Sequence, residues 1–170
     1  MSDYTLNSFD GYILAVEEKR LLMKRDCSWG TEEMIVTIAE NTKILDTENG
    51  YPLLAGSLKM GMPIRAYVGE TMTMSLPPIV NGVMILCGIS TDYSFPMYTA
   101  VKASNFEEDR IGMVVVIDGM EIYVDENTIL LPYLTRNLIR MDDLTPGRRF
   151  LIWPDAENAS RAQKIILFMD

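Results

Sequence analysis

Histidine is absent from this sequence of 170 residues. Its absence removes the commonest general base, the Ser-His and Cys-His pairs, and the usual zinc ligand. Cysteine is scarce too: the two residues, Cys27 and Cys87, have no CxxC spacing, which favours isolated thiols over a disulfide or a redox pair. The P-loop, GxGxxG and GxSxG motifs are also missing. We therefore expect a protein with no catalytic residues, no cofactor and no metal site.

Long apolar runs and an excess of positive charge are missing as well. No run approaches the roughly 18 apolar residues that span a bilayer. The N-terminus has no basic start followed by a long apolar segment, so a cytoplasmic location is expected. The net charge is -9, with 7 Lys and Arg against 12 Asp and Glu in residues 1–92, and 8 against 12 in residues 93–170. Because nucleic-acid binding depends on cations that neutralise phosphates, this acidic composition argues against DNA or RNA as the main partner.

The residues that are present indicate a folded protein with an internal repeat. Hydrophobic residues make up 48% of the chain and charged residues 23%, a balance typical of globular proteins. A shift of 86 residues aligns Met34–Val68 with Met120–Pro154 without a gap, and such self-similarity indicates a duplicated unit. Seven of the 35 aligned pairs are identical, including Glu-Asn-Thr at 40–42 and 126–128. The alternative explanation is that two unrelated segments share strand-forming composition.

Each copy has the pattern of short strands separated by turn residues. MIVTIA and MEIYVD alternate with the period of two that is typical of a half-buried strand. Glycines at 61 and 147 permit tight turns into PIRAYVG and RFLIWPD. Upstream hairpins (YILAV with RLLMK, YTAVK with IGMVVVI) and closing strands (VMILC, KIILFMD) bring the total to about five per copy.

Helix is expected only as turns near Pro52–Lys59 and Leu138–Asp143. These patterns predict an all-β protein built by tandem duplication of a small five-stranded OB-like barrel. The first barrel is predicted at residues 1–92 and the second at residues 93–170, because STDYSFPM interrupts the strand pattern between them.

A resemblance to known modules rests on three motifs of the first copy. A strand ending in ENTKIL is followed by SLKMGMPIRAYVG, and then by MTMSLPP and a closing apolar strand. This succession resembles bacterial β-rich modules that are found beside the stalk-like domain named after the N-terminus of copper amine oxidase. The resemblance covers Met34–Leu86, and Met120–Phe168 more loosely. It implies an OB-like module in a binding or envelope-associated setting and brings no catalytic residues with it.

The stretch ETMTMSLPPIVNGVMIL, from Glu70 to Leu86, breaks the strand pattern at two prolines. Prolines cannot donate to a ladder, so they belong at an edge or outside the sheet. The first copy also has about four more residues here than the second. We interpret residues 70–82 as a projecting arm that could pair with another chain. Its predicted partner-binding residues are Met72, Met74, Leu76, Pro77 and Pro78. The alternative is that the segment folds back over its own barrel.

Other residues suggest competing chemistry. The chain has 13 methionines, and the pairs Met60/Met62 and Met72/Met74 offer thioethers that suit Cu(I), although methionine is equally a filler of irregular cores. Aromatic residues that could contact an oligosaccharide or pack in the core are Trp29, Tyr67 and Trp153. Acidic clusters that could act as a carboxylate pair or lie on solvated turns are Glu17-Glu18, Glu107-Glu108-Asp109 and Asp142-Asp143.

The balance of these patterns favours a non-enzymatic protein. The expected function is binding or assembly through contacts with a protein partner or with a second copy as a homodimer, made by the arm. The alternatives are a module that binds a small ligand, Cu(I) or an oligosaccharide, and an enzyme that works with carboxylates alone.

Overall fold

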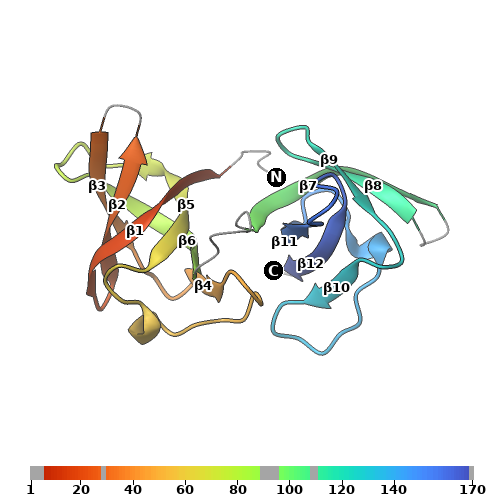
Figure 1. Ribbon diagram of the computed structural model, residues 1–170, viewed down its shortest axis with the longest axis horizontal. Helices are drawn as coiled ribbons and strands as arrows, with labels where there is room; N and C mark the ends of the chain where they lie inside the picture. Colours follow the sequence, from red (N-terminus) through yellow and green to blue (C-terminus); the bar gives the residue numbers. More distant parts are fainter. Residues whose placement is uncertain (1–5, 28–29, 89–95, 108–110, 169–170) are drawn as a thin grey trace. The chain divides into compact units, whose positions relative to one another are not determined.

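The computed structural model describes residues 6–27, 30–88, 96–107 and 111–168. These residues form two compact units, one within Leu6–Phe95 and the other from Pro96 onward. Both units are β structures built on the same plan, so the predicted all-β fold and its duplication are confirmed (Figure 1). The predicted boundary between residues 92 and 93 lies outside the described residues.

The first unit is a closed five-stranded barrel. The described part of this unit has six strands, five of which form the barrel: β1 (Asn7–Glu17), β2 (Arg20–Cys27), β3 (Gly30–Thr37), β4 (Lys43–Asp46), β5 (Pro63–Met72) and β6 (Ile79–Cys87). Their order is β3-β2-β1-β5-β6-β4, and a parallel pairing of β3 with β6 closes the ring. This is the strand order of an OB-like barrel, to which β4 adds a short strand beside β6.

The second unit repeats this order. Its strands are β7 (Met97–Glu107), β8 (Ile111–Val116), β9 (Glu121–Val124), β10 (Ile129–Pro132), β11 (Arg149–Pro154) and β12 (Ala162–Phe168), in the order β10-β12-β11-β7-β8-β9. Where β3 and β6 form a ladder, their counterparts β9 and β12 are joined by the isolated bridge Tyr123–Arg161. The second barrel is therefore closed less tightly than the first.

Equivalent threonines, Thr42 and Thr128, make the same pair of hydrogen bonds in the two units. Thr42 Oγ1 donates to the carbonyl of Gly82 at 2.8 Å and accepts from the backbone N–H of Ala39. Thr128 Oγ1, 86 residues later, donates to the carbonyl of Ala162 at 2.7 Å and accepts from the N–H of Asp125. Each hydroxyl thus fastens the turn after β3 or β9 to β6 or β12.

Short elements complete each unit. β4 and β10 lie in segments that the sequence pattern leaves irregular, and both pair in parallel with a closing strand. In the part of the chain that the structure describes, the helical content consists of two 3-10 turns, η1 (Ala55–Ser57) and η2 (Met141–Asp143), within the predicted helical turns. None of the helices in the described residues is long and apolar enough to cross a membrane.

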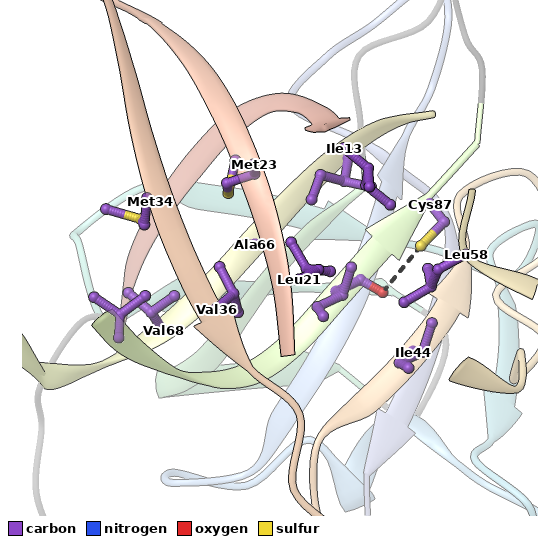
Figure 2. Close-up of a cluster of buried hydrophobic side chains, with 13 residues drawn as sticks. Ile13, Leu21, Met23, Met34, Val36, Ile44, Leu58, Ala66, Val68 and Cys87 are labelled. Carbon is purple, nitrogen blue, oxygen red and sulfur yellow. Dashed lines mark hydrogen bonds between the residues drawn. The ribbon is translucent and has the colours of Figure 1, made fainter. Parts of the chain in front are cut away.

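Alternate strand residues fill the first barrel, as their period of two requires. Figure 2 shows this cluster, whose fully buried members include Ile13, Met23, Met34, Val36 and Ala66. Methionine here acts as a core filler. Cys87 also lies in the cluster with its Sγ 4.0 Å from the Ile85 carbonyl oxygen, and burial raises the pKa of its thiol to about 12. The thiol is therefore protonated at neutral pH and is a poor nucleophile.

Ion pairs stabilise the closure of the second barrel, where β9 and β12 are joined by one bridge. Arg161 donates to both carboxylate oxygens of Asp125 at 2.6 and 2.8 Å, and to Asp155 at 2.8 Å. These contacts join the turn after β9 to the loop that precedes β12. The hydrogen bonds from Arg161 lower the pKa of Asp125 from 3.8 to about 2, helped by the backbone N–H of Asn127.

We expect Asp125→Asn to reduce the pH dependence of the second unit. A carboxylate whose pKa is lower in the folded chain stabilises the fold above about pH 4. That contribution is lost as the pH falls toward the folded pKa of about 2. Because 31% of the Asp125 side chain is exposed, solvent screening limits the loss at pH 7 to about 1 kcal/mol. Urea unfolding from pH 2 to 7, followed by Trp153 fluorescence in a Trp29→Phe background, measures it.

Glu121→Gln provides the control, since this exposed residue of the same unit undergoes the same change of charge. It should leave the slope of stability between pH 4 and 2 unchanged. An Asp125→Asn protein with the wild-type slope would exclude the ion pair as its cause.

Candidate functional site

The predicted arm is a β-hairpin that extends the ends of β5 and β6. Met72 pairs with Val80, and between this pair and Val68–Gly82 the register is irregular because β5 contains extra residues. Such a bulge increases the local twist and changes the direction of the hairpin. The connecting loop lies beside β3 (Figure 1), and the N–H of Ile35 in β3 donates to the Pro78 carbonyl at 2.9 Å. The prolines therefore lie just before the ladder of β6 begins.

Hydrogen bonds order the tip of the arm, which we define as Thr73–Pro78. The N–H of Thr73 donates to the Ile79 carbonyl, and Thr73 Oγ1 accepts from the N–H of Ile79 at 2.8 Å. Thr73 and Ser75 share a hydroxyl contact of 2.6 Å, and Ser75 donates to the Pro77 carbonyl at 3.1 Å. The Leu76–Pro77 peptide is cis. The tip is thus a closed turn held by polar groups rather than by packing.

The largest side chains of the tip point into solvent. Met74 is 99% exposed and Leu76 is 96% exposed, whereas Met72 is about half exposed and the two prolines are partly buried. The alternative that these side chains fold back over the barrel is therefore wrong for Met74 and Leu76. The structure brings all five predicted residues together on one hairpin.

The arm is longer than the sequence comparison suggests. Lys43 pairs with Met84 in the first unit and Ile129 pairs with Lys164 in the second, separations of 41 and 35 residues. The first copy therefore has six extra residues, and not about four, because Leu86 corresponds to Ile166 in the register and not to Phe168. The second unit has a short polar loop in place of the arm, in which Asp155 accepts from the N–H groups of Glu157 and Asn158.

The residues of the alternative Cu(I) and oligosaccharide sites are not brought together on one exposed surface, as those of the arm are. Met60 is exposed while Met62 packs against the core of the first barrel. Tyr67 is buried, and the Lys164 amine lies 4.9 Å from the ring centroid of Trp153. Trp29 lies outside the described residues.

Some carboxylates of the three acidic clusters are paired with other groups, and others lie outside the described residues. Glu17 pairs with Arg20, and Asp143 accepts from the N–H of Arg140. Glu108 and Asp109 lie outside the described residues. Where the structure describes the chain, no three His, Cys, Asp or Glu residues are grouped so that they could hold a metal ion.

Comparison with known proteins adds no relative. No protein-family model matches the sequence, and no curated protein matches it. The resemblance to bacterial modules beside stalk-like domains therefore stays a prediction.

The sequence interpretation missed the polar residues that shape the tip. Thr73 and Ser75 alternate with the exposed apolar residues in TMTMSL, and this alternation is a signal that could have been used. A strand with one buried face would place its polar residues toward solvent. Here the hydroxyls bond to each other and across the turn, and the apolar side chains lie in solvent.

Proposed function

We propose that this chain is a non-enzymatic protein that binds a partner protein, or a second copy of itself, through the tip of the arm. The main support is the combination of order and exposure at Met74 and Leu76. Removing such side chains from water contributes roughly 1.5–3 kcal/mol each. Because the tip is already fixed by hydrogen bonds, little further ordering would oppose binding.

The charges on the first barrel support a protein partner over a nucleic acid. The strands that OB-like barrels commonly use for nucleic acids correspond to β2 and β3. Arg25 on β2 forms an ion pair with Glu32 on β3, and Lys24 lies opposite Glu33 in the register. The cations on both faces of these two strands are thus matched by carboxylates, which would oppose contact with phosphates.

Site-specific photo-crosslinking tests the proposed surface. We expect a benzophenone amino acid at position 74 or 76 of the full chain to form adducts in cells that naturally contain the protein. An adduct of twice the chain mass would identify a second copy, and other masses would identify a partner. Combining the probe at 76 with Met74→Ser should reduce the yield at least tenfold, because one anchor is lost.

The matched control is a probe at Leu54, which is also exposed and lies in the same unit. It measures random collisions. Equal yields at 54 and 74, or no adduct at 74 and 76, would rule out the arm as the binding surface.

The described residues give no comparable support to Cu(I) or an oligosaccharide. Met60 and Met62 are divided between solvent and the core. Met72 and Met74 are both exposed on the arm, and Tyr67 is buried. A protein contact by the arm is therefore the function that we propose.

A further inference from the structure

The outer edge of β10 has backbone groups that face away from its neighbour. β10 ends the sheet of the second unit and pairs on one side with β12 in parallel (Figure 1). The N–H of Tyr133 donates to the Leu167 carbonyl, so the groups of Ile129, Leu131 and Tyr133 face β12. The N–H and C=O of Leu130 and the C=O of Pro132 then face outward, and no described residue bonds to them. An edge of this kind is a template for another strand.

The first unit shows what such an edge accepts. Its β4 occupies the same place beside β6, but the chain turns back and covers it. The N–H of Asp46 donates to the Tyr51 carbonyl at 2.9 Å, and the N–H of Leu53 donates to the Ile44 carbonyl at 2.7 Å. The segment Tyr51–Leu53 thus forms an isolated antiparallel bridge, Leu45–Pro52, on the outer edge of β4.

Two substitutions between the copies explain why β10 has no such cover. Pro132 stands where the first copy has Asp46, so the donor of the first covering hydrogen bond is missing. Arg136 stands where Gly50 takes a φ of 75° and makes the return turn, a conformation that favours glycine. Within the described chain, no backbone hydrogen bond joins residues 134–140 to β10.

The side chains around this edge are apolar and basic. Exposed large apolar residues are Ile129, Leu131, Leu134 and Leu138, the last of them 94% exposed. From Asn127 to Met141 the sequence has no Asp or Glu but contains Arg136 and Arg140, both exposed. No ion pair joins either arginine to a described residue. Residues 127–141 thus have two positive charges and no negative one, in a chain whose net charge is -9, and Asp142 and Asp143 follow them directly.

We propose that the β10 edge, Ile129–Pro132, binds an extended strand of another protein that is apolar at alternate positions and acidic at its flanks. The strand lies antiparallel to β10, as Tyr51–Leu53 lies on β4, and exchanges two hydrogen bonds with Leu130. Its carboxylates face Arg136 and Arg140.

Selection from a phage-displayed library of random ten-residue peptides on the immobilised full chain tests this surface. We expect enriched peptides with alternating apolar residues and net negative charge. Ile129→Lys should weaken their binding at least tenfold. This variant should fold, since Ile129 is about half exposed and its counterpart in the first unit is Lys43. Arg136→Glu with Arg140→Glu should weaken binding to a similar degree.

Two further measurements distinguish backbone strand pairing from non-specific hydrophobic binding. Two variants of a selected peptide are methylated at the backbone nitrogens, one at the odd positions and one at the even positions. Only one of the two should lose binding, because only one set of N–H groups faces Leu130. Leu54→Lys, which also replaces an exposed aliphatic residue with lysine but lies in the first unit, should have no effect. Failure to enrich any peptide, selection of basic peptides, or binding that ignores Ile129→Lys would overturn the proposal. Dimerisation of the chain that Ile129→Lys abolishes would also overturn it, because the occupant would then be a second copy.

Discussion

Gly82→Ala is expected to destabilise the first barrel by about 3 kcal/mol or more, because a methyl group has no room at this point of β6. A Cβ on Gly82 would lie 2.6 Å from the backbone oxygen of Thr37 and 2.9 Å from Cγ1 of Val36. Both belong to β3, whose ladder with β6 closes the ring. The conflict is steric, and it involves a backbone atom that cannot rotate away.

The second unit shows that the same position tolerates a methyl group where the seam is looser. Ala162 corresponds to Gly82, since each carbonyl accepts from the equivalent threonine. Ala162 is fully buried, yet it is accommodated because β9 and β12 are joined there by one bridge only. Glycine therefore occurs at this position where a ladder closes the barrel, and alanine occurs where one bridge closes it.

Hydrogen exchange of the full chain, resolved by mass spectrometry, measures the effect of Gly82→Ala for each unit separately. Protection of β3 and β6 should fall, while that of the second unit should stay constant. The arm should also lose protection, because the Ile35–Pro78 hydrogen bond crosses the same seam. Gly56→Ala is the control, since nothing lies within 4 Å of its Cβ position. Wild-type protection of β3 in Gly82→Ala would show that the seam can yield.

The long strands of this fold could be predicted because their evidence is local. Met34 and Val36 are buried while Ile35 and Thr37 are partly exposed, as the alternation of MIVTIA requires. β4 and β10 were missed for the opposite reason. KILD and ILLP are only four residues long, and their ladder partners lie about 40 residues further along the chain. Nothing in such short runs distinguishes a strand from a loop.

The candidate site was predictable in its location but not in its shape. The two prolines and the extra residues in the first copy indicated an arm, and the arm is present. Whether Met74 and Leu76 faced the barrel or solvent depended on the hydrogen bonds of Thr73 and Ser75. Those bonds follow from three-dimensional geometry, which the order of residues does not reveal.

The β10 edge could not be predicted because it depends on register. The exchange of Asp46 for Pro132 has a meaning only when both are known to occupy the same place in the sheet. Once they are aligned, the two copies show complementary differences. The first unit covers its edge strand and extends an arm, whereas the second has a short polar loop and an uncovered edge. Duplication has thus left each unit with a different exposed apolar surface.

The second large effect is expected for Thr128→Val, which should destabilise the second unit by about 2–3 kcal/mol. Valine keeps the shape of threonine but lacks the hydroxyl group. The Ala162 carbonyl then loses its donor and the N–H of Asp125 loses its acceptor. Unpaired polar groups of this kind cost about 1–3 kcal/mol each when they are buried. Urea unfolding followed by Trp153 fluorescence in the Trp29→Phe background measures the change.

Two companion variants separate the hydroxyl from the methyl group and one unit from the other. Thr128→Ser keeps both hydrogen bonds and should recover most of the stability. Thr42→Val removes the same contacts in the first unit, where Thr42 is only partly buried, so its cost should be smaller and confined to that unit. Two results would contradict the role given to this hydroxyl: a Thr128→Val protein as stable as the wild type, or Thr128→Val and Thr128→Ser proteins of equal stability. The loss in the second unit should be the greater one, because β9 and β12 are joined by one bridge where β3 and β6 form a ladder.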